Sequence, residues 1–235
     1  MPARIPMTAK QREALLALPM TEEEVIAHHS LDENERAAIA RLRSPANQLG
    51  YALQLCCLRF PGRYLRRGEL LPAIMLDHVA EQIDVDADVI ADFAKRGPTR
   101  YEQLASIKRT HGLVDLTHPV RAELKQWLEA EALSCTDGRL LLERLIARMR
   151  ERKIIIPGVS VIERLTASAM HAADAKVASE ILAQLNTEQK AKLNAVLDDK
   201  THAQQSRLSW LREPPIRVGA RGLFELLDKI DYIRR

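Results

Sequence analysis

Cys56 and Cys57 are the first residues whose types suggest chemistry, because thiolates bind zinc and take part in redox reactions. Neighbouring residues of a helix point about 100° apart, so two adjacent thiols cannot converge on one metal ion or on each other. With Cys135 as the only other cysteine, the chain has no disulfide framework. We therefore interpret Cys56 and Cys57 as small apolar core residues, and the cysteine content predicts a protein of a reducing cytoplasm.

Aspartates form the second group of candidate residues. Asp84, Asp86 and Asp88 stand at every second position, and Asp198 precedes Asp199. Carboxylates near the start of a helix typically interact with the helix dipole rather than with a metal ion. The seven histidines are scattered, and the chain lacks His-Glu-x-x-His, Gly-x-Gly-x-x-Gly and Gly-Lys-Ser/Thr motifs. The sequence therefore predicts no catalytic residue, no metal site and no cofactor in this chain.

Basic and acidic residues occur in separate blocks, although the net charge is only +3. Residues 41–67 hold six arginines and no acid, and residues 69–92 hold seven acids and neither lysine nor arginine. Residues 95–112 return to five bases against the single acid Glu102. Blocks of one sign indicate a local electrostatic footprint that the net charge conceals, and the basic blocks favour an anionic partner.

Helices are the elements that must position these residues. Aromatic residues are only 4% of the chain, alternating apolar and polar runs are missing, and only residues 154–156 look extended. Capping boxes, in which a Ser or Thr is followed three residues later by Glu or Gln, are predicted at Thr8/Gln11, Thr21/Glu24, Ser30/Glu33, Thr99/Glu102 and Ser160/Glu163. The predicted helices are 8–18, 21–29, 32–43, 46–60, 72–83, 86–96, 99–111, 119–134, 137–153, 159–185, 187–199, 205–212 and 219–233.

These helices predict an all-α fold with tandem trihelical, helix-turn-helix-like modules followed by a bundle of longer helices. We expect a first DNA-binding module at 1–68 and a second at 69–112. We expect a helical bundle, linker or further DNA-binding or dimerisation region at 119–235. No run of eighteen apolar residues occurs, and the N-terminus lacks a signal peptide, so the sequence predicts no membrane partner.

Residues 76–95 have the spacing of a helix-turn-helix, although Asp84 stands where the turn usually carries glycine. The helix predicted at 86–96 begins with aspartates, which repel phosphates. The next helix, 99–111, is therefore the better candidate to enter a DNA groove. The polar residues expected on its DNA-facing side, opposite Leu104 and Ile107, are Thr99, Arg100, Gln103 and Thr110.

Residues 43–67 start polar, become apolar for about a dozen residues and end in an arginine-rich loop. We interpret the apolar face as core and the two polar ends as a surface that straddles a nucleic-acid backbone. A core helix with merely solvated arginines is the alternative. The complete set of residues predicted to bind DNA is Arg41, Arg43, Asn47, Gln48, Arg59, Arg63, Arg66, Arg67, Arg96, Thr99, Arg100, Gln103, Lys108 and Arg109.

Several motifs resemble the Tn-three family of replicative (class II, TnpA-type) transposases. Residues 47–62, Asn-Gln-Leu-Gly-Tyr-Ala-Leu-Gln-Leu-Cys-Cys-Leu-Arg-Phe-Pro-Gly, are similar to a segment near the start of these proteins. Residues 11–19, 99–104, 152–164 and 210–214 match further family motifs in the same order. The chain departs from the family at Gln48 and Tyr101, where arginine is usual, so DNA contacts at these two positions are the least secure.

The resemblance implies an N-terminal region whose partner is double-stranded DNA, namely the terminal inverted repeats of a transposon. It implies the remainder of the transposase as a partner, leaves a homodimer open, and associates the protein with the bacterial nucleoid. The family's Asp-Asp-Glu site, with its divalent metal, lies far downstream and is expected to be absent here. The alternatives are a helical interaction or dimerisation module that binds no DNA, and a truncated stand-alone repressor of transposition.

Overall fold

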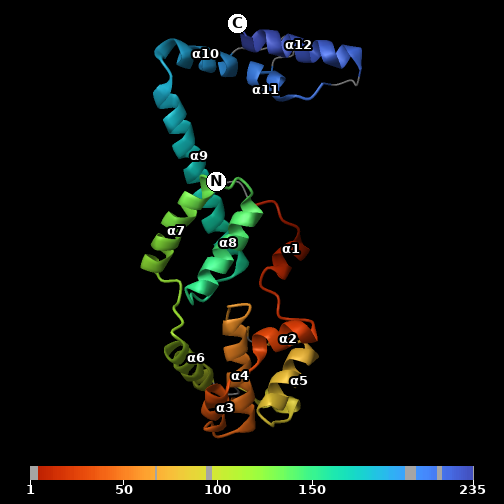
Figure 1. Cartoon of the computed structure of the whole chain (residues 1–235), viewed down its shortest axis with the longest axis vertical. Coiled ribbons are helices and arrows are strands. Elements are labelled where there is room, and N and C mark those ends of the chain that lie inside the picture. Colours follow the sequence, from red (N-terminus) through yellow and green to blue (C-terminus); the bar gives the residue numbers. More distant parts are fainter. Residues whose placement is uncertain (1–4, 67, 94–96, 199–204, 216–218, 235) are drawn as a thin grey trace. The chain divides into compact units, whose positions relative to one another are not determined.

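The computed structural model describes residues 5–66, 68–93, 97–198, 205–215 and 219–234 (Figure 1). These residues form α-helices and one 3-10 helix (η1), and an isolated parallel β-bridge pairs Val114 with Ile154. The fold is all-α, as predicted. The helices are α1 (Ala9–Ala14), α2 (Glu22–His29), α3 (Glu33–Ala40), α4 (Pro45–Arg59), α5 (Ala73–Gln82), η1 (Ala87–Asp92), α6 (Gly97–His111), α7 (His118–Ala132), α8 (Gly138–Glu151), α9 (Val159–Gln184), α10 (Thr187–Asp198), α11 (Arg207–Arg212) and α12 (Ala220–Arg234).

The chain divides into two compact units, Met1–Ala175 and Lys176–Arg235, and the division falls within α9. The first unit contains two hydrophobic cores, one built on α2 to α6 and the other on α7, α8 and the first half of α9. The separation of residues 1–112 into two DNA-binding modules stays a prediction. Among the described residues, no helix is both long and apolar enough to cross a membrane.

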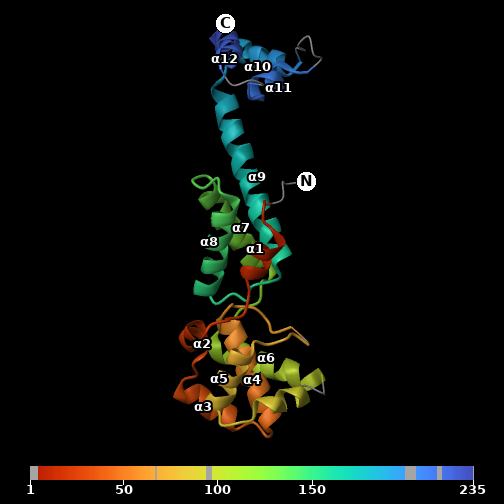
Figure 2. The same ribbon diagram turned by 90° about the vertical axis from the view of Figure 1, so that its right-hand side faces the viewer.

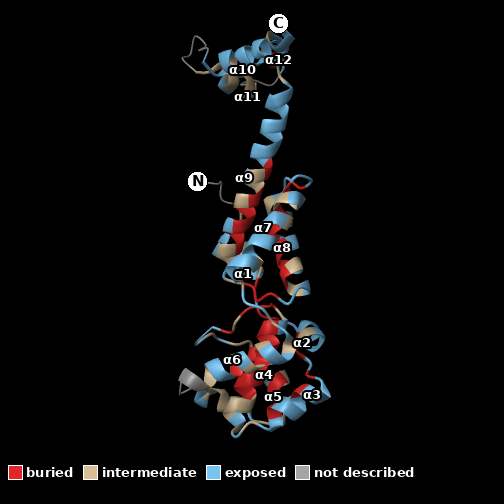
Figure 3. Cartoon of the chain, turned by 90° about the vertical axis from the view of Figure 1, so that its left-hand side faces the viewer, coloured by how far each residue is buried: buried red, intermediate tan, exposed pale blue. Residues whose placement is uncertain are grey.

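Helix α4 is the centre of the first core. Its residues from Leu49 to Leu58 are all buried, because α2, α3, α5, η1 and α6 all pack against it (Figures 2 and 3). A helix that is apolar on every side requires neighbours on every side. Cys56 and Cys57 are completely buried here, and burial raises the pKa of Cys57 to about 12. Both thiols are therefore inert core residues, and this interpretation of the sequence is confirmed.

Gly50 permits the close approach of η1 to α4. A Cβ atom added at Gly50 would lie 2.1 Å from Cδ2 of Phe93, the residue that ends η1. We expect Gly50→Ala to lower the free energy of unfolding by about 1–3 kcal/mol, since overpacking outweighs the ~0.5–1 kcal/mol that alanine gains over glycine in a helix. Urea unfolding followed by circular dichroism measures this change.

Phe93→Ala supplies the control for Gly50→Ala, because it removes the ring that the new methyl group would strike. In a double-mutant cycle, Gly50→Ala should cost much less in the Phe93→Ala background than in the wild type. An equal cost in the two backgrounds would contradict the proposed contact.

The second core lies between α7, α8 and the first half of α9, and Ile5 and Leu16 from the N-terminal segment complete it. Its centre contains Leu128 of α7, Leu145 of α8 and Ile162 of α9, each fully buried. Helix α9 has buried residues up to Ala173, whereas its second half is exposed (Figure 3).

Residues 154–156 are extended, as predicted, and they connect the two cores of the first unit. The amide of Ile155 donates to the carbonyl of Val114, and the amide of Val114 donates to Lys153. The amide of Ile156 donates to the carbonyl of Gly62 at 2.8 Å. The three isoleucines are buried, so the backbone bonds and the side chains both hold this segment in place.

Several local expectations need correction. The predicted helix 86–96 is the short 3-10 helix η1 over its described residues. Ser30 does not begin a helix: its hydroxyl donates to Ile26 at the end of α2, and Asp32 forms the capping box with Glu35. An Asp and a Glu three residues apart can cap a helix as Ser and Glu do, which explains the shift. Ser160 lies inside α9, whereas the capping box at Thr8 is confirmed.

The second unit contains α10, α11 and α12. The rings of Trp210 and Tyr232 meet edge to face with centroids 5.8 Å apart, and the guanidinium of Arg207 lies over both rings. Lys229 donates to the carbonyl of Glu213. Large apolar residues nevertheless stay exposed along α12, namely Leu223, Phe224, Leu226, Leu227, Ile230 and Ile233.

Candidate nucleic-acid interface

Helix α6 is the helix predicted to enter a DNA groove. Its buried face includes one of the residues expected to face DNA, Gln103. Ile107 is fully buried and Gln103 is only 6% exposed, whereas Tyr101 is 74% exposed. Positions 103 and 107 are one turn apart and share a face, so the expectation that Gln103 lies opposite Ile107 is wrong. Arg109 and Thr110 lie on the exposed side.

Gln103 fixes α6 to α4. Its side-chain oxygen accepts a hydrogen bond from the amide of Gln54 at 2.9 Å, and its nitrogen donates to the carbonyl of Asn47 at 3.1 Å. Both halves of its side-chain amide are therefore occupied in the core. Gln103 positions the exposed residues of α6, because it sets the rotation of the helix about its own axis.

A groove lies between α6 and the loop that follows α4, and basic residues line it. Its volume is about 930 Å³, its apolar lining includes Leu71 and Leu104, and its cations are Arg66, Arg100 and Lys108. This groove brings together two of the predicted basic blocks, one from residues 41–67 and one from residues 95–112. Tyr101 also lines the groove, next to these cations.

Two of the groove cations have partners within the protein. The guanidinium of Arg100 donates to the carbonyl of Leu65, and Lys108 pairs with Asp115 at 2.8 Å. Asp115 also accepts a hydrogen bond from the hydroxyl of Tyr64, and these two hydrogen bonds lower the pKa of Asp115. The Lys108–Asp115 pair is partly exposed, so an external anion can compete with the carboxylate for Lys108 at small cost.

Arg63 is a structural residue of the loop and has little exposed surface. It is 7% exposed, and both of its terminal nitrogens bond the carboxylate of Glu69 at 2.9 and 2.6 Å. Its Nε donates to the carbonyl of Leu16 at 2.9 Å. Burial is the largest single influence on Glu69 and would raise its pKa, but the hydrogen bonds from Arg63 and from the backbone amide of Arg66, together with the charges of both arginines, outweigh it and lower the pKa. In this fold Arg63 shapes the groove loop and does not face solvent.

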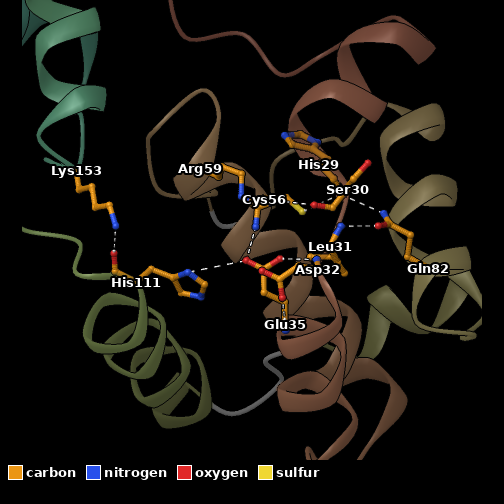
Figure 4. A network of polar contacts seen from close by, with 10 residues as sticks. All are labelled: His29, Ser30, Leu31, Asp32, Glu35, Cys56, Arg59, Gln82, His111 and Lys153. Atoms are coloured by element: carbon orange, nitrogen blue, oxygen red, sulfur yellow. Dashed lines mark hydrogen bonds and ion pairs between the residues drawn. The ribbon is translucent and has the colours of Figure 1, made fainter.

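Arg59 belongs to a polar network at the end of α4 (Figure 4). Its guanidinium pairs with Glu35 of α3 and donates to the carbonyl of Ser30 at 2.7 Å. His111, at the end of α6, has its Nδ1 3.9 Å from the same carboxylate. The neighbouring His29 is fully buried with its Nε2 2.9 Å from the carbonyl of Phe60, and burial lowers the pKa of His29. Arg59 thus connects α4 to α3 and to Ser30, the residue that caps the C-terminal end of α2.

The remaining predicted residues of the first block lie at the junction of α3 and α4. Arg41 and Arg43 are exposed, and neither lines the groove. The side-chain amide of Gln48 donates to the carbonyl of Leu42 at 3.0 Å, and Asn47 offers its carbonyl to Gln103. Gln48 therefore closes the C-terminal end of α3.

The described members of the predicted set differ in accessibility. Arg66 and Arg109 are exposed, and Thr99, Arg100 and Lys108 are half-buried. Arg67 and Arg96 lie outside the residues that the structure describes. Sequence reasoning omitted Tyr101 from the site, although its position between Arg100 and Glu102 on a helix with Ile107 in the core would have predicted its exposure.

The described residues contain no group of three or more His, Cys, Asp or Glu side chains that could hold a metal ion. The chemistry that the described groove offers is thus the binding of an anion through Arg and Lys donors, with the aromatic rings of Tyr64, Phe93 and Tyr101 in the same lining.

A family described as "Domain of unknown function (DUF4158)" matches residues 7–169, and the chain belongs to this family. The chain is 30% identical over 230 residues to the transposase for transposon Tn21 of Escherichia coli. It is 30% identical over 236 residues to the transposase for transposon Tn501 of Pseudomonas aeruginosa. Each match covers 98% of this chain.

The transposase for transposon Tn1546 of Enterococcus faecium is 26% identical over 230 residues, which cover 97% of this chain. The resemblance to Tn-three-family transposases is confirmed by these similarities. The chain spans 23% of the length of each of these three relatives. It is thus related to proteins of DNA transposition and corresponds to less than a quarter of such a protein.

Proposed function

We propose that this chain binds the terminal inverted repeats of a transposon, as the DNA-recognising part of a replicative transposase. The observation that carries the proposal is the groove in which Arg66, Arg100 and Lys108 come together from two separate basic blocks. Similarity to transposases supports duplex DNA as the anion. The proposed partners are double-stranded DNA and the remainder of the transposase, and the proposed place of action is the bacterial nucleoid.

The accessible part of the groove surface has the residue types that DNA binding requires. Arg66 and Arg109 can neutralise backbone phosphates, and Lys108 can exchange Asp115 for a phosphate. Arg100 lies near the start of α6, where a recognition helix reaches deepest into the major groove. We leave the buried Arg63 and Gln103 out of the proposed contact surface, because neither can reach DNA without unfolding its surroundings.

We further propose that this chain needs the remainder of a transposase to cut and join DNA. The three relatives named above are about four times as long as the matched segment. The resemblance assigns the Asp-Asp-Glu site to a downstream part of the family's proteins. In this proposal the chain supplies recognition and the remainder supplies the metal-dependent chemistry.

Fluorescence anisotropy with two duplexes tests the proposal. One duplex carries the terminal repeat of the chain's own transposon, and the other has the same bases in scrambled order. We expect the terminal repeat to bind about 10³-fold more tightly or better, with log K falling linearly as log salt rises. Equal affinity for the two duplexes, or affinity that does not change with salt, would contradict sequence-specific DNA binding.

Protein–protein association is a second candidate function, and α12 is the observation that favours it. Phe224 and Ile233 are 66% and 69% exposed, in a row with other apolar residues of that helix. An apolar row of this kind is typical of a surface that another protein chain covers. Sedimentation equilibrium of the purified chain over a range of concentrations tests this candidate.

A further inference from the structure

A second, smaller cavity lies at the end of α4. It is separate from the groove described above, because the two linings share no residue. Its volume is about 300 Å³. Arg59, His111, Arg150 and Lys153 line it, together with the carboxylate of Glu35 and apolar residues of α4 and the 113–154 region. None of the residues in the proposed DNA contact surface, Arg66, Arg100, Lys108 and Arg109, lines this cavity.

The charges that line the cavity are not balanced. Three permanent cations, Arg59, Arg150 and Lys153, face one carboxylate, Glu35, so the lining has an excess of two positive charges. Glu35 is already occupied by Arg59 (Figure 4). Burial lowers the pKa of His111, although Glu35 opposes this effect, so His111 adds little positive charge at neutral pH. The excess charge is that of Arg150 and Lys153.

Arg150 is held in place without a carboxylate partner among the described residues. Its Nε donates to the carbonyl of Pro61 at 3.1 Å, and its guanidinium carbon lies 4.6 Å from the centre of the Phe60 ring. Phe60 is in turn stacked on His28, with centroids 4.1 Å apart. The two terminal nitrogens of Arg150 make no hydrogen bond to the described part of the chain. A half-buried guanidinium with a fixed plane and four free N–H donors on its two terminal nitrogens is preorganised for an oxyanion.

Lys153 brings the second cation to the same cavity. Its backbone has a φ of 55°, in the left-handed region that lysine seldom adopts. Lys153 lies two residues after the end of α8, and its Nζ donates to the carbonyl of His111 at 3.2 Å (Figure 4). That hydrogen bond uses one of the three donors of the ammonium group and leaves two.

We propose that this cavity binds a phosphate group, held by the terminal nitrogens of Arg150 and the ammonium group of Lys153. Free phosphate carries between about one and two negative charges near neutral pH, and a phosphate of the DNA backbone carries one, so the two excess positive charges of the lining can neutralise either. The planar guanidinium supplies a bidentate contact, and the ammonium supplies a point charge. The phosphate can be a free ion or a phosphate of the DNA backbone, and the two sources can be distinguished.

Equilibrium dialysis with radiolabelled inorganic phosphate, at constant ionic strength in chloride, tests the free-ion source. We expect Arg150→Met to weaken phosphate binding by about tenfold or more, because it removes a charged, bidentate donor and keeps the aliphatic stem. Lys153→Asn should also weaken it, and asparagine tolerates the left-handed backbone. Arg144→Met is the matched control, since Arg144 is on the same helix, pairs with Glu131 and does not line the cavity.

DNA binding tests the other source. If a backbone phosphate fills the cavity, Arg150→Met should lower the slope of log K against log salt by about 0.9, whereas Arg144→Met should not. Weaker phosphate binding or a lower salt slope in Arg150→Met, with Arg144→Met unchanged, supports the proposal. The measurement that changes identifies the source of the phosphate. The proposal is overturned if Arg150→Met and Lys153→Asn bind both phosphate and DNA as the wild type does. Since phosphate dialysis needs no DNA, its result is independent of the proposed DNA binding, and circular dichroism verifies that each variant is folded.

Discussion

The Arg63→Met variant is expected to lose about 2–4 kcal/mol of unfolding free energy, although Arg63 lies in a basic block that suggests a DNA-binding surface. The substitution removes both hydrogen bonds to Glu69 and the hydrogen bond to the carbonyl of Leu16. The carboxylate of Glu69, whose side chain is only 15% exposed, would then lack its main counter-charge. Removal of one partner from a largely buried pair costs more than the pair contributes.

Arg66→Met is the matched control for Arg63→Met, because Arg66 is exposed and three residues away in the same loop. We expect Arg66→Met to change the unfolding free energy by less than about 0.5 kcal/mol. Urea unfolding followed by circular dichroism measures both variants. Arg63→Lys should be nearly as unstable as Arg63→Met, since an ammonium group cannot make the two parallel bonds to Glu69. Equal stability of Arg63→Met and Arg66→Met would show that the Glu69 pair contributes little.

The triple variant Arg66→Ala, Lys108→Ala and Arg109→Ala should have the largest effect on DNA binding. Each cation that contacts a phosphate contributes about 0.9 to the slope of log K against log salt, so three lost contacts lower the slope by about 2.7. Arg66 and Arg109 are exposed, and the pair that Lys108 forms with Asp115 is partly exposed, so the fold should persist. Fluorescence anisotropy at several salt concentrations measures the slope.

A second triple variant, Arg139→Ala, Arg144→Ala and Arg148→Ala, controls for total charge. It removes the same number of cations from α8, far along the chain from the groove residues. We expect the slope of this variant to stay close to that of the wild type. If the two triple variants lower the slope equally, DNA binding depends on overall charge, and the groove is not the site.

Much of the fold could be predicted from the sequence, since it depends on local patterns. Capping at Thr8, the all-α class and the extended residues 154–156 follow from residue types within a few positions of each other. The burial of Cys56 and Cys57 follows from the largely apolar stretch between Leu49 and Leu58. Separate blocks of charge could also be recognised, because a block needs no knowledge of the partner on another element.

The tertiary structure decided which of the basic and polar residues are available to a ligand. Arg59 is occupied by Glu35, 24 residues away, and Gln103 by Gln54, 49 residues away. The sequence shows that an arginine is charged, but it does not show how far that arginine lies from a carboxylate on another helix. The same physical reason applies to Arg150, whose position in a cavity with Lys153 depends on packing between distant helices. Helix type is thus determined locally, whereas the accessible charge is determined by the packing of the helices.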